Sequence, residues 1–225
     1  MNNPVEVIAL VEGLTEKNFI ESLVAPWLAR RNVFITPTIL TKPGQKGGDV
    51  KFSRARRDIG KHLKQRDTTY LTLFMDYYGI KSDWPGCKEA KKISDHRKKA
   101  EAVNTATAQA VVASFEKQNA ARRFIPYIGM HEFEALLFSA PPVLARHLGI
   151  KEQEVQEILA ECGEPEKIND SSKTAPSKRL DELSAKHFKK TTTGIAIASE
   201  TGLPGIRGKC PLFDAWLKKL ETLRA

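Results

Sequence analysis

Acidic residues follow three short apolar runs in this 225-residue sequence. They are Glu12 after residues 5–11, Asp76 after residues 69–75, and the segment His131-Glu132-Phe133-Glu134 after residues 123–128. Carboxylate oxygens are the ligands that hard cations such as Mg²⁺ prefer, with water and phosphate oxygens filling the other positions. A cation held in this way shields a phosphodiester, positions a water and stabilises the departing oxygen. The pattern favours phosphodiester chemistry with Mg²⁺ or Mn²⁺ as the cofactor.

Each acidic residue has a structural explanation to set against the functional one. Glu12 and Asp76 end apolar runs, where a buried carboxylate must be paired or metal-bound, which favours a functional role. Glu16 either adds a ligand or matches the dipole of the helix it begins. His131 and Glu134 share one face of a helical turn, either as base and ligand or as a buried imidazole and a dipole-matching acid. The predicted metal ligands are Glu12, Glu16, Asp76, Glu132 and Glu134, and the predicted catalytic residues are Glu12, Asp76, His131 and Glu134.

Alternating strands and helices would bring these positions together. Apolar, β-branched runs predict strands at 5–11, 33–40, 69–75 and 123–128. Apolar residues at helical spacing predict helices at 15–31, with an interruption at Pro26, at 53–65 and at about 95–117. Such alternation implies an α/β fold with a mostly parallel sheet and helices on both faces. Ligands of these sheets bind beyond the carboxyl ends of the strands, where the acidic residues fall.

The pattern changes after about residue 150. Helices are predicted at 152–162, from Thr174 onward and at 213–223. The prediction is an α/β core at 1–150 and a helical C-terminal extension at 151–225 that packs on the sheet. Within the extension, Ser177, Lys178 and Arg179 follow Pro176 at a helix start. These three residues either bind phosphate beside the free N–H groups of that helix or only cap it.

Positive charge is concentrated in one segment of the chain. Residues 41–100 hold 16 Lys and Arg against 7 Asp and Glu, whereas the rest holds 20 of each, so this segment carries the whole net charge of +9. A local excess of this kind favours a polyanionic partner, and nucleic acid is the predicted one. The alternative is the solvated face of ordinary helices. The predicted contact residues are Arg54, Arg56, Arg57, Lys61 and Lys64.

Motifs and composition argue against several other classes of protein. The chain has no P-loop, no GxGxxG after its first strand, no GxSxG and no HExxH. No apolar run approaches the roughly 20 residues of a membrane span, and the first residues do not resemble a secretory signal. The three cysteines form no CxxC pair, so we expect neither a zinc knuckle nor a disulfide framework. The expected location is a reducing cytoplasm.

Several segments resemble a known family. The two around Glu12 and Asp76 resemble the Toprim arrangement of topoisomerases, primases and the overcoming-lysogenisation-defect (OLD) nucleases. All of them together resemble an uncharacterised bacterial Toprim-like family, a domain-of-unknown-function group often found beside AAA-type ATPases. The segments are Val11-Glu12-Gly13-Leu14-Thr15-Glu16, Phe74-Met75-Asp76-Tyr77-Tyr78-Gly79, the stretch from His131 to Ser139, Ile168-Asn169-Asp170, the stretch from Thr174 to Arg179, and Cys210-Pro211-Leu212-Phe213.

The resemblance implies a Toprim-like core with a metal-dependent nuclease or other phosphotransfer role in bacterial defence, with an AAA-type ATPase as a partner. One position departs from the pattern, because Toprim proteins carry Asp-x-Asp after the third strand and Tyr78 replaces the second aspartate here. Asp83 or the segment 131–134 would then supply the missing ligand. Two hypotheses stay open: a metal-dependent phosphodiesterase acting on DNA or RNA, and a noncatalytic module that binds nucleic acid or a partner ATPase. The oligomeric state is open as well.

Overall fold

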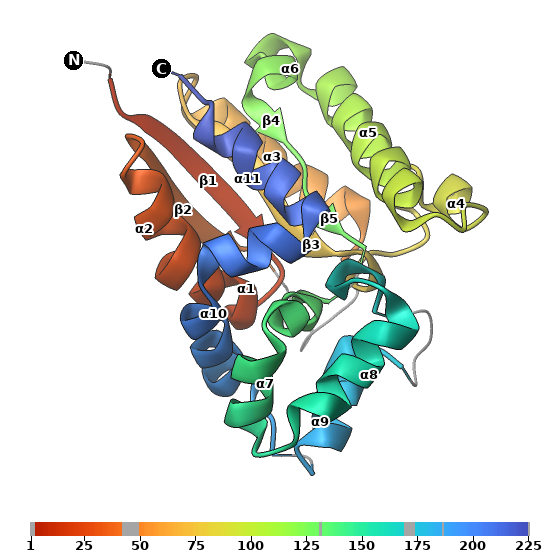
Figure 1. Ribbon diagram of the computed structural model, residues 1–225. Helices are drawn as coiled ribbons and strands as arrows, with labels where there is room; N and C mark the ends of the chain where they lie inside the picture. The colour runs from red at the N-terminus through yellow and green to blue at the C-terminus, as the bar shows by residue number, and fades with distance from the viewer. Residues whose placement is uncertain (1–2, 42–49, 131, 169–173, 186, 225) are drawn as a thin grey trace.

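The computed structural model describes residues 3–41, 50–130, 132–168, 174–185 and 187–224 (Figure 1). Within these residues, five strands pair in parallel in the order β2-β1-β3-β4, with β5 pairing to β3. The predicted α/β fold with a mostly parallel sheet is confirmed. The strands are β1 Val5–Val11, β2 Val33–Ile39, β3 Tyr70–Asp76, β4 Phe124–Ile125 and β5 Ile128–Gly129.

The register of the strands determines where the acidic residues lie. Val11, the last residue of β1, pairs with Phe74, so β3 extends past β1 and ends on Asp76. Asp76 in turn pairs with Gly129 of β5, and the chain continues from there into the segment that contains Glu132. The segments that follow the neighbouring strands β1, β3 and β5 therefore all leave the sheet at the same edge.

Helices cover both faces of the sheet, as predicted. The core of one face is shared by α3 Phe52–Gln65, α4 Cys87–Ala90, α5 His96–Ser114 and α6 Ala120–Arg123. The core of the other face is shared by α1 Leu14–Phe19, α2 Ala25–Ala29, α10 Ile195–Lys209 and α11 Pro211–Glu221. Figure 1 shows α7 Pro141–Leu148, α8 Glu152–Cys162 and α9 Pro176–Leu183 beyond the ends to which the strand arrows point.

The C-terminal helices share a core with the sheet. Trp216 of α11 stacks on Tyr127 with ring centroids 5.2 Å apart, and its indole N–H donates to Thr72 Oγ1 in β3 at 2.9 Å. The predicted helical C-terminal stretch is thus confirmed, while the division of the chain at residue 150 stays a prediction. No helix in the described residues is long and apolar enough to cross a membrane.

Three local features differ from the sequence-based expectation. The strand expected at 123–128 is two short strands, because Pro126 lies between them and has no N–H to donate. The first helix contains a π-helical turn, Ile20–Val24. The helical segment that follows it has Pro26 as its second residue, and Pro26 lacks the N–H of the regular i−4 bond. Helix α10 was not predicted, and it bends at Gly202, whose φ of 69° suits glycine.

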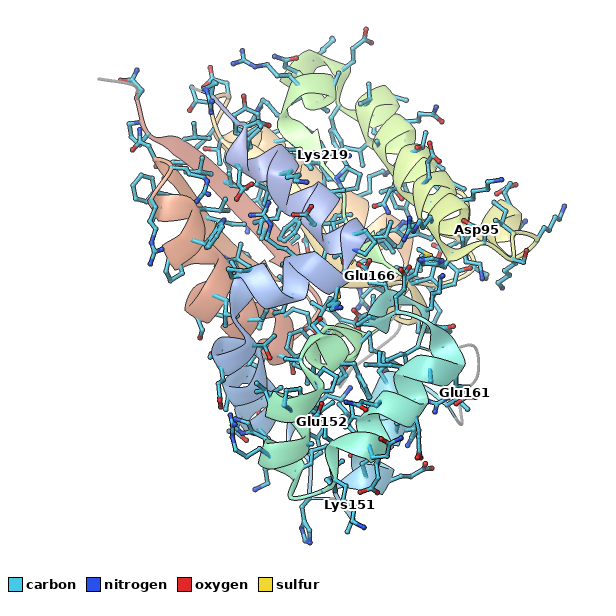
Figure 2. All side chains as sticks on the ribbon, in the orientation of Figure 1. Asp95, Lys151, Glu152, Glu161, Glu166 and Lys219 are labelled. Carbon is cyan, nitrogen blue, oxygen red and sulfur yellow. The ribbon has the colours of Figure 1, made fainter. Side chains whose placement is uncertain are left out.

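Glu166 caps α11 from inside the protein (labelled in Figure 2). Its two carboxylate oxygens accept the N–H groups of Leu212 and Phe213 at 2.8 and 2.9 Å, and the residue is 5% exposed. Burial raises the pKa of Glu166 from 4.5 to about 7, although the two N–H bonds lower it. The folded state therefore keeps a proton that the unfolded chain releases. The free energy of unfolding should fall by about 2–3 kcal/mol as the pH rises from the ordinary pKa of 4.5 through the raised pKa of about 7.

The variant Glu166→Gln is expected to lose this part of the pH dependence, because an amide does not titrate. Urea unfolding of wild type and variant at about pH 5 and about pH 7.5 measures the difference. A variant whose stability changes with pH as steeply as that of the wild type would show that Glu166 is not the titrating group.

Candidate functional site

Five carboxylates converge where β1, β3 and β5 end. Asp76 is the last residue of β3, and Glu12 directly follows β1. Burial raises the pKa of Asp76 well above its usual range, and the negative charges of Glu16, Glu134, Glu12 and Glu132 raise it further. The structure therefore brings together the side chains of all five residues predicted as metal ligands.

Glu12 and Glu16 are positioned by two glycines. The Oε2 atom of Glu16 accepts the N–H of Gly13 at 2.9 Å, so Glu16 caps α1 and also contributes its charge to the cluster. The carboxylate of Glu12 packs against Gly79, just beyond β3, where a Cβ atom would collide with Glu12 Oε2. Glu16 therefore has the helix-capping role that was one of its two explanations, and its role as a metal ligand stays a prediction.

Glu134 is paired with a lysine from a distant part of the chain. It lies in the 3-10 helix Phe133–Ser139, is 1% exposed, and has its Oε1 2.7 Å from the Nζ of Lys190. Burial raises the pKa of Glu134, although the Lys190 ammonium lowers it. Burial lowers the pKa of Lys190, but the charges of Glu134, Glu132 and Asp76 outweigh it and raise that pKa overall. The ammonium thus partly neutralises the cluster.

The helix start predicted to bind phosphate binds a carboxylate of the same chain. Glu132 Oε2 accepts the N–H of Ser177 at the beginning of α9, at 2.9 Å. Arg179 pairs with Glu161 at 3.1 Å, while Lys178 is exposed. Phosphate binding by these three residues stays a prediction, and at the Ser177 amide it would require Glu132 to move.

The oxygen donors of the cluster suit Mg²⁺ or Mn²⁺, because a hard cation offsets the repulsion between carboxylates. Among the described residues, no group of three or more Asp, Glu, His or Cys side chains is arranged so that it could hold a metal ion. Magnesium is commonly held by one or two carboxylates, with water and substrate phosphates in the other positions. Metal binding by Asp76 and a neighbouring carboxylate stays a prediction. His131 lies outside the described residues, and Asp83 is exposed and is not among the described groups that perturb Asp76.

Residues 11–221 match the family described as Domain of unknown function (DUF4276). The chain belongs to this family. Among solved structures it is similar to the C-terminal region of the Xanthomonas campestris pv. campestris OLD protein, at 13% identity and a TM-score of 0.40, over 96% of this chain and 94% of that one. Similarity at that level carries no argument about activity. A comparison with curated proteins gives no match.

Four of the predicted basic residues of this DUF4276 protein line one groove. The groove has a volume of about 730 Å³, lies between α3 and the end of α5, and is lined by Arg56, Arg57, Lys61 and Lys64 among others. These four side chains are exposed. Arg54, the fifth predicted contact, is half-buried and does not line the groove.

Two positions of the DUF4276 site were not predicted as functional residues. Lys190 belongs to a segment that has no recognised motif, and only the tertiary fold places it against Glu134. Gly79 ends the segment that carries Asp76, but the contact that makes a glycine necessary involves Glu12 from another strand. A glycine three residues after an acidic strand end is a signal that could mark a close approach of this kind.

Gly79→Ala is expected to displace the Glu12 carboxylate without unfolding the protein, because the collision involves the mobile end of a side chain. The affinity for Mn²⁺ should fall by about tenfold or more, the scale of a disturbed ligand position. Thermal unfolding with increasing Mn²⁺ measures the loss, since a ligand of the folded state raises Tm. Gly208→Ala is the control, because a Cβ there meets nothing within 4 Å. Equal Mn²⁺ responses of the two variants would contradict the role given to Glu12.

Proposed function

We propose that this protein is a Toprim-like, metal-dependent phosphodiesterase that acts on nucleic acid. The observation that carries the proposal is the raised pKa of Asp76 among four other carboxylates at the carboxyl edge of a parallel sheet. Gathering like charges destabilises a protein unless a cation balances them. Strongly perturbed carboxylates at such an edge are typical of functional sites.

The residues of the cluster have different roles in this proposal. Asp76 and Glu12 would hold Mg²⁺ or Mn²⁺, with Glu16 as a further carboxylate. The bound cation would shield the phosphodiester charge and stabilise the departing oxygen. A water would attack the phosphorus as the bond to the departing oxygen breaks, and Glu134 is suited to accept the proton of that water, because burial raises the pKa of Glu134. Glu132, fixed by the Ser177 amide, would hold the segment that carries Glu134 in place.

The basic groove on α3 would bind the nucleic-acid backbone. Replacing Arg56, Arg57 and Lys61 with Ala is expected to weaken binding to duplexes and single strands alike, because phosphate contacts do not read sequence. The slope of log affinity against log salt should become shallower by about three, or about one for each lost contact. Fluorescence anisotropy with EDTA present, at several salt concentrations, measures both quantities.

The control for this experiment removes three positive charges elsewhere. Lys209, Lys219 and Arg224 are exposed and lie in or just after the helices α10 and α11, which cover the other face of the sheet (Lys219 is labelled in Figure 2). Replacing them with Ala should change the slope far less. Equal changes in both triple variants would mean that only net charge matters and that the groove has no role of its own.

A noncatalytic module that binds nucleic acid or an ATPase is the second candidate function. It is favoured by the ion pair between Lys190 and Glu134, which places a cation of the chain itself inside the cluster. Tyr78, at the position of the second Toprim aspartate, favours it as well. For either function we propose, from the resemblance, an AAA-type ATPase partner and a role in bacterial defence. From the spacing of the cysteines we propose a cytoplasmic location.

A cleavage assay distinguishes the two functions. Supercoiled, linear and single-stranded DNA, and RNA, are incubated with Mg²⁺ or Mn²⁺, with and without a neighbouring ATPase. A phosphodiesterase should cleave only with metal, and the Glu12→Gln/Glu134→Gln double variant should be inactive. Cleavage that survives in that variant would contradict the proposed site. No cleavage under any condition, together with metal-independent binding, would favour the module.

A further inference from the structure

An open pocket adjoins the carboxylate cluster. It has a volume of about 620 Å³, and its lining includes Tyr77, Tyr78, Lys99, Met130, Lys167 and Arg179. Asp95, at the start of α5, and Glu161, on α8, also line it (both are labelled in Figure 2), so the pocket lies between these two helices. The two tyrosines directly follow Asp76, and Met130 also lines a small internal cavity together with Asp76 and Glu132. The pocket therefore shares a wall with the proposed catalytic site.

Tyr78 presents an aromatic ring to this pocket. The residue is 46% exposed, so part of its surface is open to a ligand. Tyr77 supports it edge-to-face, with ring centroids 5.7 Å apart and an interplanar angle of 83°. The Tyr77 side chain is in turn hydrogen-bonded to the buried Cys87. Tyr78 thus rests on a ring that is itself anchored, which leaves less side-chain entropy to lose when a ligand binds.

Positively charged side chains line the same pocket as the exposed Tyr78 ring. The Lys99 ammonium lies 6.0 Å from the centroid of the Tyr77 ring and forms no ion pair with a described residue. Two further cations line the pocket and are paired with acids: Lys167 Nζ is 3.9 Å from Glu164, and Arg179 is 3.1 Å from Glu161. Lys99 is therefore the described cation of this pocket best placed to meet an incoming phosphate, beside a stacking surface and near the carboxylates.

We infer that this pocket binds a nucleotide of a single-stranded nucleic acid, with its base stacked on Tyr78 and its phosphate near Lys99. This assignment rests on the proposed function and specifies its substrate. A base inside a duplex is stacked on both faces, so only an unpaired base can present a face to a protein ring. Stacking on an aromatic side chain tolerates any base and contributes substantially to binding. The strand then continues from the pocket toward Asp76.

The test is a binding measurement without cleavage. A labelled 12-nucleotide oligothymidylate, the same backbone without bases, and a matched duplex are titrated with protein in EDTA, by fluorescence anisotropy. Wild type should bind the oligothymidylate about tenfold or more tightly than the base-free strand. Tyr78→Ala should abolish that preference, while Tyr78→Phe should retain it. Phe34→Ala is the control, because Phe34 is also an exposed aromatic residue, 49% exposed, but lies on β2.

Equal affinity of the wild type for the two single strands, or an unchanged preference in Tyr78→Ala, would overturn the assignment. The result is independent of the proposed phosphodiesterase activity. A Tyr78-dependent preference in a protein that never cleaves would uphold the pocket and refute the enzyme. Metal-dependent cleavage without any preference for bases would uphold the enzyme and refute the pocket.

Discussion

Replacing Asp76 with asparagine is expected to lower metal-dependent cleavage by about two orders of magnitude or more, the scale of a lost ligand or general base. Without metal, the same variant should unfold at a higher temperature than the wild type at neutral pH. Burial and four neighbouring carboxylates raise the pKa of Asp76, so the folded state is destabilised as pH rises and Asp76 loses its proton. An uncharged asparagine escapes that effect. Scanning calorimetry in EDTA and initial cleavage rates in Mn²⁺ measure the two results.

The opposite signs of these two effects make the prediction specific. At acidic pH, where Asp76 is protonated in both states, the gain in Tm should disappear. Asp83→Asn is the matched control, because Asp83 is exposed and is not among the described groups that perturb Asp76. A variant Asp76→Asn that is less stable than the wild type at neutral pH would show that the carboxylate serves the fold.

Glu134→Gln is expected to lower cleavage by a similar factor, because Glu134 is the proposed proton acceptor.

Replacing Lys190, the ion-pair partner of Glu134, should instead lower the stability of the protein. Lys190→Met leaves the Glu134 carboxylate, which is 1% exposed, without its counter-ion, and should destabilise the protein by about 1–3 kcal/mol. The expected loss is smaller than for a fully buried ion pair, because the Lys190 side chain is half-exposed. The double variant should recover part of that stability. Urea unfolding of the four proteins gives the coupling between the two side chains.

The affinity for Mn²⁺ separates the two candidate functions in the same variants. A phosphodiesterase should bind Mn²⁺ more tightly in Lys190→Met, because the competing ammonium is gone. Lys189→Met, an exposed neighbour, serves as the control. If neither the wild type nor Lys190→Met binds Mn²⁺, Lys190 is a structural counter-ion of a noncatalytic module.

The sheet and its acidic edge were predictable because their causes are local in sequence. A β-branched run such as Val5–Val11 strongly favours a buried parallel strand, and the acid that ends it must lie at the carboxyl edge. The same reasoning places Asp76, at the end of a second apolar run, at the carboxyl edge of the sheet. The convergence of five carboxylates required only that the strands be neighbours, which the alternation of strands and helices implies.

The partners of those carboxylates depend on contacts between distant parts of the chain. The Glu134 segment and the helix start at Ser177 are separate motifs in the sequence, and nothing local indicates that the Ser177 amide binds Glu132. Lys190 is one of many lysines, and its role arises only from the packing of the segment before α10. Helix α10 itself was missed because Gly202 and Pro204 interrupt its pattern.

Titration of Mn²⁺ by isothermal calorimetry tests most directly the central claim that the carboxylates around Asp76 bind a divalent cation. The wild type is expected to bind Mn²⁺ and to release protons, because the raised pKa of Asp76 keeps that carboxyl partly protonated before the metal arrives. The heat should therefore depend on the ionisation enthalpy of the buffer, and both Asp76→Asn and Glu12→Gln should lose the binding. No binding by the wild type, or the same binding isotherm in Asp76→Asn, would contradict the claim.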